Sequence, residues 1–304
     1  NGPVTTNSNT GVVAVSNYTE GNKIDLGSTA ADTKADTLEL SSDEINKITA
    51  SKLIVGTNDT TAGDSTITQG KNTGNIYITQ AIAPKGTSVV HMYTGQDTST
   101  IAETGDGKLT SDGTGTLNLA ITAAGSVNLD NENKITTFAD TSSSTSNGSV
   151  RLNTGNNNLT IGTVDGVTGV TTKAINNTDA VVLGTQAGFI NNVGSVGITT
   201  GSGSYWRVYS ATPEGDTLNG LKSESYAIWN TKYDKGAVPK TVYGYNMDDK
   251  ANHYIFQPQF SVKYTPVSTT KEYGTDLTGY STGIKGSNYN VDLSEVKNEA
   301  YARD

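Results

Sequence analysis

The sequence predicts an all-β protein built as a parallel β-solenoid, in which short strands stack coil upon coil around a narrow interior. Three observations support this prediction. Short apolar clusters rich in Val, Ile and Leu recur up to residue 200, turns of Gly, Asn, Asp, Ser and Thr separate them, and only 33% of the residues are hydrophobic. Small clusters of this kind suit a slender interior better than the larger, aromatic core of a β-sandwich.

We expect strands where the apolar clusters begin. These positions are Val12, Ile24, Leu38, Leu53, Ile67, Ile76, Val89, Leu117, Val127, Val150, Leu159, Val170, Val181 and Val196. If one coil takes roughly 20 to 25 residues, the chain up to residue 200 forms about eight to ten coils. At ~4.8 Å per coil this is a rod of very roughly 40 to 50 Å, with Thr and Asn stacked as ladders between coils.

One segment, Ser41 to Leu53, has a helical pattern. Ser42 is a candidate N-cap, Asp43 and Glu44 fill the first turn, and Ile45 and Ile48 lie three residues apart on one side. We expect a single helical turn at a corner of a coil.

The stretch from Gly201 to Pro213 marks a change in composition. Before it there are few large aromatic residues, and all but three of the 15 tyrosines lie after residue 200. Ser204 to Tyr209 alternates, so a strand here puts Trp206 and Val208 on one face, and the other face carries Tyr205, Arg207 and Tyr209. One face can therefore seal the end of an apolar core.

This change predicts three regions. Residues 1–210 form the solenoid, residues 211–262 a Tyr-rich cap and connection, and residues 263–304 a partial β module or an extended C-terminal arm. Aromatic rings also suit contacts with a partner or a glycan, and the candidates for such contacts are Tyr205, Arg207, Tyr209 and Trp229. Packing over the last coil is the favoured role for the aromatic residues.

Charge and composition exclude several classes of function. A net charge of -9 argues against nucleic acid and anionic membranes as partners, because both require a basic surface. The chain has no cysteine, so it can form neither a disulfide nor a thiolate metal site. No apolar run approaches the ~20 residues of a membrane helix, and no secretory leader opens the sequence at Asn1. We therefore predict no membrane insertion.

Enzyme motifs are weak. Asn177, Thr178 and Asp179 spell the NTD found in polygalacturonases, and Asp248 with Asp249 offers a second pair of carboxylates. Inverting hydrolysis needs two carboxyl groups about 6.5 to 9.5 Å apart, whereas these candidates fall on opposite sides of the predicted cap. Turn chemistry explains both sites, so we predict no catalytic residues and no cofactor.

Metal sites are also weakly indicated. His91 and His253 are far apart in sequence and have no Cys or H-x-x-x-H partner, so a surface or packing role is favoured. Three segments rich in Gly, Asp and Asn faintly resemble calcium-binding turns: Gly105 to Leu109, Asp112 to Leu117, and Asp130 to Asn133. The full calcium-binding nonapeptide never occurs, so ordinary hydrogen-bonded turns are favoured.

Four segments resemble one known family. Leu38 to Thr68, Leu159 to Thr172, Gly188 to Leu221 and Ala251 to Val262 are similar, in that order, to segments of filamentous-haemagglutinin-type exoproteins, the secreted partners of two-partner secretion systems. The resemblance implies a right-handed parallel β-helix, an outer-membrane β-barrel secretion partner, and display at a bacterial surface as an adhesin or fibre.

The chain departs from this family at both ends. The N-terminal secretion domain is not recognisable in Asn1 to Thr37. Lys271 to Gly286 is similar to the opening of the small K-x-Y-G modules that follow such solenoids, but the chain ends soon afterwards, so the module looks incomplete.

Two functional hypotheses follow. The first is a secreted structural or adhesive rod without catalytic chemistry, whose partners are a host or neighbouring cell surface or other copies of itself. In a narrower version, copies polymerise end to end and the C-terminal arm adds a strand to a neighbour. The alternative is a carbohydrate-binding or polysaccharide-cleaving β-helix protein.

Overall fold

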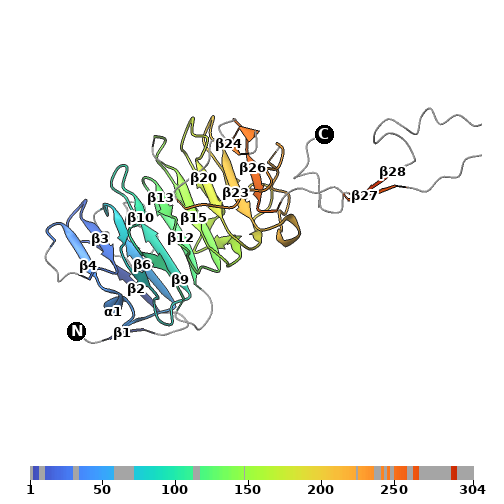
Figure 1. The fold of residues 1–304 in the computed structure, drawn as a ribbon. Coiled ribbons are helices and arrows are strands. Elements are labelled where there is room, and N and C mark those ends of the chain that lie inside the picture. Colours follow the sequence, from blue (N-terminus) through green and yellow to red (C-terminus); the bar gives the residue numbers. More distant parts are fainter. Residues whose placement is uncertain are drawn as a thin grey trace, which may run out of the picture.

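The structure is a computed structural model. It describes residues 3–6, 11–29, 34–57, 72–111, 117–146, 148–223, 225–235, 241–242, 245–246, 250–258, 263–266 and 289–292. Within these ranges nearly all regular structure is β-strand, and most strands belong to two long parallel sheets (Figure 1). The prediction of an all-β chain with parallel stacking is confirmed.

The first sheet has nine strands, and every neighbouring pair in it is parallel. From one edge to the other the strands are β4 (Thr37–Leu40), β3 (Lys23–Leu26), β7 (Ile76–Ile78), β10 (Ile101–Glu103), β13 (Val127–Leu129), β15 (Val150–Asn153), β20 (Val181–Gly184), β23 (Trp206–Ser210) and β26 (His253–Phe256). Beyond β3 the spatial order follows the chain order, so each new strand is laid on the one before it.

The second sheet is also parallel. Its main path runs through β2 (Val12–Val15), β6 (Lys52–Gly56), β9 (Val89–Tyr93), β12 (Asn118–Ala123), β14 (Thr137–Ser142), β16 (Leu159–Ile161) and β21 (Phe189–Asn191), while β19 (Val170–Thr172) and β22 (Ile198–Thr199) continue beside β14. The chain passes from this sheet to the first and back again in successive coils, which is the path of a solenoid.

Short pairs complete the fold. Two are parallel: β1 (Val4–Thr5) with β5 (Ile48–Thr49), and β8 (Ala81–Ile82) with β11 (Lys108–Leu109). Three are antiparallel: β17 (Thr163–Val164) with β18 (Val167–Thr168), β24 (Thr241–Val242) with β25 (Tyr245–Asn246), and β27 (Lys263–Pro266) with β28 (Tyr289–Asp292). Most of the predicted C-terminal module, residues 263–304, lies outside the described residues.

The core is a column of aligned apolar side chains along the first sheet. Ile76, Ile101, Val127, Val150 and Val181 are paired in register and are all buried. Successive members of this column, continued to its next partner in β23, lie 25, 26, 23, 31 and 25 residues apart. Two coils therefore exceed the predicted length, and the longest of them contains the inserted hairpin β17–β18.

Buried polar side chains occupy the corners between the sheets. Thr185 Oγ1 donates to the Asn157 carbonyl (2.6 Å), Asn153 Nδ2 donates to the Asp130 carbonyl (3.1 Å), and Asn133 Oδ1 accepts from the Leu109 amide (2.7 Å). A buried backbone group without a partner costs free energy, so a corner that breaks the β ladder needs such side chains. This requirement accounts for much of the Thr and Asn in the sequence.

The helical turn α1 (Ser42–Ile45) forms where it was expected, but its cap is Ser41 and not Ser42. Ser41 Oγ accepts from the Glu44 amide (3.3 Å), and the Glu44 carboxylate accepts from the Ser41 amide (3.0 Å). This reciprocal capping box requires a spacing of three residues, which only Ser41 has from Glu44. Ile45 and Ile48 are buried as predicted.

Other expected strand positions differ in detail. Ile67 lies outside the described residues, and Val196 is 68% exposed because its strand, β22, begins two residues later. Strands β10, β14 and β21 were not expected, since each mixes apolar with polar residues: they read IAE, TFADTS and FIN. No helix among the described residues is long and apolar enough to cross a membrane.

Candidate functional site

Strand β23 carries two of the four predicted contact residues, Arg207 and Tyr209, and shows the predicted alternation. Trp206 and Val208 face the interior and are 3% and 0% exposed. Arg207 and Tyr209 lie on the opposite face, yet they are also buried, at 0% and 2% exposed. In this structure neither presents a surface to a partner or glycan.

A covering segment, residues 225–235, buries Tyr209. Ile228 forms a parallel bridge with Ile255 of β26, and the Tyr233 ring packs edge-on against Tyr209, with centroids 5.2 Å apart. Gly184 of β20 makes room for it, because a Cβ there would lie 2.5 Å from the Tyr233 ring. The outer face of the first sheet is therefore a second, smaller apolar layer at this end.

The remaining two predicted contact residues are only partly buried. Tyr205 precedes β23, and Trp229 of the covering segment stacks at a tilt on Phe256, with ring centroids 4.9 Å apart. A glycan or partner contact at Tyr205, Arg207, Tyr209 and Trp229 stays a prediction, and for the two buried residues it would require displacement of the covering segment.

Asp179 is tied to Arg207. Its Oδ1 lies 2.6 Å from Arg207 Nε, and its backbone amide donates to Asn177 Oδ1 (2.9 Å). The second contact is a local Asx turn, which supports the turn role expected for the NTD sequence. The proposed second carboxylates, Asp248 and Asp249, lie outside the described residues.

Aromatic side chains fill the interior at the C-terminal end of the stack. The Tyr254 ring packs edge-on against Trp206, with centroids 5.0 Å apart, and also contacts Phe189. The Tyr254 hydroxyl donates to the Leu221 carbonyl (2.7 Å), and burial raises its pKa. The first sheet thus continues one strand beyond β23, and Trp206 and Tyr254 together form the plug that was expected from Trp206 and its neighbours.

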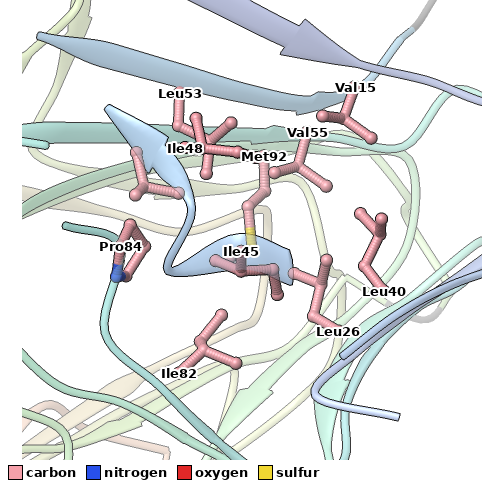
Figure 2. A pocket seen from close by; sticks show the side chains of 11 residues that line it. Val15, Leu26, Leu40, Ile45, Ile48, Leu53, Val55, Ile82, Pro84 and Met92 are labelled. Carbon is pink, nitrogen blue, oxygen red and sulfur yellow. The ribbon is translucent and has the colours of Figure 1, made fainter. Parts of the chain in front are cut away.

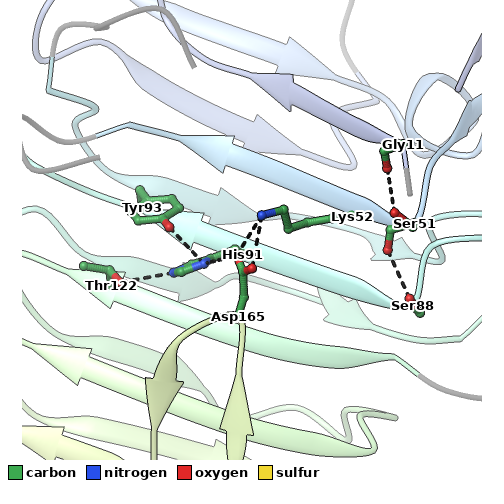
Figure 3. Close-up of polar contacts among 8 residues, drawn as sticks. All are labelled: Gly11, Ser51, Lys52, Ser88, His91, Tyr93, Thr122 and Asp165. Atoms are coloured by element: carbon green, nitrogen blue, oxygen red, sulfur yellow. Dashed lines mark hydrogen bonds and ion pairs between the residues drawn. The ribbon is translucent and has the colours of Figure 1, made fainter. Parts of the chain in front are cut away.

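His91 lies in a polar cluster on the outer face of the second sheet (Figure 3). Its Nδ1 is 2.8 Å from Asp165 Oδ2 and 2.9 Å from the Tyr93 hydroxyl, and its Nε2 is 3.1 Å from Thr122 Oγ1. Lys52 Nζ also binds Asp165, at 3.1 Å. The sequence separates His91 from Asp165 by 74 residues, so no local pattern predicted their contact.

The electrostatics of this cluster favour a neutral histidine. Burial lowers the pKa of His91, and the hydrogen bond to Asp165 only partly opposes it. Burial acts to raise the pKa of Asp165, but hydrogen bonds from His91 and Lys52 together hold it below its usual range. A neutral ring with Nδ1–H donating to Asp165 and Nε2 accepting from Thr122 satisfies both nitrogens.

The cluster fastens the hairpin β17–β18 to the sheet. Val164 of the hairpin packs with Ala120 and Ala139, which lie on the outer face beside His91. Asp165 and Gly166 form the two-residue turn, both with positive φ (47° and 84°). An Asp-Gly pair between β-branched residues is a strong hairpin motif, so the hairpin itself could have been predicted from sequence.

His253 has a packing role. It is completely buried in β26, its Nδ1 lies 3.0 Å from the Tyr226 carbonyl, and its ring contacts the Tyr226 ring at 5.0 Å between centroids.

Two of the candidate calcium segments meet in space. Asn131 Nδ2 donates to the carbonyls of Gly105 (3.2 Å) and Gly107, and the Asn131 amide donates to Glu103 Oε2 (2.7 Å). Burial raises the pKa of Glu103 to about 7. The described residues contain no group of three or more His, Cys, Asp or Glu side chains placed to hold a metal, and residues 112–116 lie outside them.

An apolar cavity lies inside the solenoid near its N-terminal end (Figure 2). Its lining includes Ile45 of α1, Leu26, Leu53 and Met92. The cavity measures about 10 Å³, close to the space of one water molecule, and is lined only by apolar residues. It is too small for a sugar or a cofactor.

Comparisons with protein-family models, with curated proteins and with solved structures find no match to this chain.

Proposed function

We propose that the chain is a structural rod of a bacterial extracellular fibre or surface adhesin, folded as a right-handed parallel β-helix and without catalytic chemistry of its own. In this proposal the coils hold an adhesive or fibre-forming surface away from the cell. The chain would leave the cell through an outer-membrane β-barrel partner, as the sequence resemblance to filamentous-haemagglutinin-type exoproteins implies.

The observation that carries the proposal is the register of the first sheet. Nine parallel strands stack with one aligned apolar column, and at ~4.8 Å per strand the sheet extends about 40 Å along the stack. Such a stack makes a stiff spacer, because the strands of successive coils pair with one another along one axis.

Charge and site chemistry agree with a role in extending and presenting a surface. The net charge of -9 favours solubility and repulsion between rods rather than attachment to phosphate-rich surfaces. Asp179, the carboxylate first considered for sugar hydrolysis, forms an ion pair with the buried Arg207. This contact supports a structural role for Asp179.

Electron microscopy of the purified chain tests the proposal, together with adhesion of chain-coated beads to cells or to a glycan array. We expect rod-shaped particles and retention on one class of surface. Compact spheres, or release of reducing sugar from a polysaccharide, would contradict it in favour of a carbohydrate-active β-helix protein.

End-to-end polymerisation belongs to the same proposal. Strands β4 and β2 are the terminal strands of the two sheets at the N-terminal end, and an uncovered edge strand is a template for further pairing. Sedimentation of the intact chain should show species larger than the monomer, and removal of residues 281–304 should leave monomers. Persistence of long species after that deletion would rule out a role for the C-terminal arm.

A further inference from the structure

The covering segment ends against a turn that belongs to a coil far back in the chain. Lys235 Nζ donates to Asn131 Oδ1, and two residues earlier the Tyr233 hydroxyl donates to Asp130. Asn131 lies two residues after the end of β13 at Leu129. Both contacts join residues more than 100 positions apart in the sequence. The chain has no cysteine with which to fasten such a contact covalently.

The side-chain amide of Asn131 is held in one orientation. Its Nδ2 donates to the carbonyls of Gly105 (3.2 Å) and Gly107, so its Oδ1 is left to face Lys235. The Lys235 amine is in hydrogen-bonding contact with the oxygen bonded to Asn131 Cγ, so a small movement would bring the amine to the amide carbon.

A carboxyl group lies at the same turn. Glu103 Oε2 accepts from the Asn131 backbone amide (2.7 Å), and its other oxygen, Oε1, is buried and has no hydrogen-bond partner among the described residues. The charge of Lys235 acts on this carboxyl. The carboxyl group is therefore bonded to the backbone of the same residue whose side-chain amide faces the Lys235 amine.

We infer that Lys235 and Asn131 join in an intramolecular amide bond, with Glu103 as the group that carries the proton. Lys235 Nζ forms a bond to Asn131 Cγ, and the Cγ–Nδ2 bond breaks. The lysine ammonium loses two protons, one before the attack and one as the new bond forms. Glu103 passes both to the departing NH2 group, which leaves as one ammonium ion for each bond formed. No oxidant or cofactor is needed.

Glu103 suits this role because its protonation is balanced near neutral pH. Only roughly one exposed lysine in a thousand is neutral at pH 7, so the amine needs a base to take its proton. With a pKa raised to about 7 by burial, Glu103 can both accept that proton and return it. The carbonyls of Gly105 and Gly107, which now hold Nδ2, would accept hydrogen bonds from the departing ammonium.

Intact-mass measurement of the full chain and sequencing of its proteolytic peptides test the inference. We expect purified protein to be lighter than its sequence by one molecule of ammonia, and to yield a branched peptide that joins Lys235 to Asn131. The variant Lys235→Arg keeps the charge at an exposed position but cannot form the bond, so it should have the full mass. Lys232→Arg, also exposed and in the same segment, should still form the cross-link.

Glu103→Gln separates proton transfer from folding. Glutamine keeps the shape of the side chain, and we expect the cross-link to form at least about 100-fold more slowly at pH 7, with circular dichroism unchanged. Folded wild-type protein that keeps its full mass after prolonged incubation at pH 7 to 8 would overturn the inference. Loss of ammonia that persists in Lys235→Arg would also overturn it, because that loss would come from cyclisation at Asn131 itself.

Discussion

Arg207 and Asp179 form an ion pair of 2.6 Å between neighbouring coils, and the arginine side chain in it is completely buried. The two residues lie 28 positions apart in the sequence. Asp179 precedes β20, and Arg207 lies in β23, the neighbouring strand of the first sheet. A charge removed from water in this way is tolerated only while its partner is present. This pair therefore makes the outer face of the first sheet, and not only the apolar interior, important for stability.

Replacement of Asp179 by Ala should destabilise the fold strongly. The buried guanidinium would lose its carboxylate, and breaking such a pair costs about 3 to 5 kcal/mol. Urea unfolding followed by circular dichroism measures the change. Asp234→Ala, at an exposed position of the covering segment, is the control and should change the free energy of unfolding by less than about 0.5 kcal/mol. Similar small effects for both variants would show that the pair contributes little.

Tyr209→Phe should leave stability unchanged or raise it by about 1 kcal/mol. The Tyr209 hydroxyl is buried and finds no hydrogen-bond partner among the described residues, so its removal relieves a desolvation cost while the ring still packs against Tyr233. The same unfolding experiment measures this. A loss of more than about 1 kcal/mol would reveal a partner for the hydroxyl.

Gly184→Ala should detach the covering segment. The added Cβ would lie 2.5 Å from the Tyr233 ring, while β20 itself can accept alanine because the glycine φ is not positive. We expect faster proteolysis within residues 225–235 and a changed near-ultraviolet circular dichroism spectrum. The double variant Gly184→Ala with Tyr233→Ala has room for the methyl group. If the spectrum of the double variant differs from that of Tyr233→Ala alone, the clash between the added methyl group and the Tyr233 ring is not what detaches the covering segment.

Trp206→Ala should cost about 3 to 5 kcal/mol, because it opens a large cavity beside Tyr254 at the end of the core. Tyr205→Ala, one residue earlier and only partly buried, should cost much less. Thermal unfolding of both variants compares them directly. Equal losses would mean that the aromatic plug does not seal the interior.

Asp140 gives the chain a predictable dependence on pH. Its side chain is fully buried in β14, where only Ser142 donates to it among the described residues, and burial raises its pKa well above 3.8. The folded state therefore keeps a proton that the unfolded chain releases near pH 3.8. Stability from this group is full below that pH and is lost at about 1.4 kcal/mol per pH unit above it, until the folded pKa is reached.

Asp140→Asn removes this loss. The stability of the variant relative to wild type should increase as the pH rises from about 4 to 7, as measured by urea unfolding at each pH. Asp106→Asn, at an exposed position, serves as the control and should show no such trend. A relative stability of Asp140→Asn that stays flat or falls with pH would mean that the buried carboxyl is stabilised in its charged form.

The strands, their inward faces and the helical turn could be predicted from sequence, because each depends on residues that are close together in the chain. β-Branched clusters between turn residues gave most strands of both sheets, and the period of two assigned Trp206 and Val208 to the interior. The helical turn at α1 was also predictable, although its cap was misplaced by one residue. β14 was missed because two of its inward positions carry Asp140 and Ser142 rather than apolar residues.

The contacts that surround the candidate sites could not be predicted in this way. His91 meets Asp165, Asn131 meets Lys235, and Tyr209 is covered by residues 225–235 only because coils of unequal length bring them together. The burial of Arg207 and Tyr209 could not be predicted either, since alternation tells which face a residue takes but not what covers that face.

The sequence by itself determined that short strands alternate between an apolar and a polar face and that turns of Gly, Asn and Asp separate them, because these preferences depend on neighbouring residues. Only the tertiary structure decided which coils lie side by side and which outer faces are buried. That outcome depends on the summed lengths of all intervening turns, and a change of a few residues in any one of them would bring different side chains into contact.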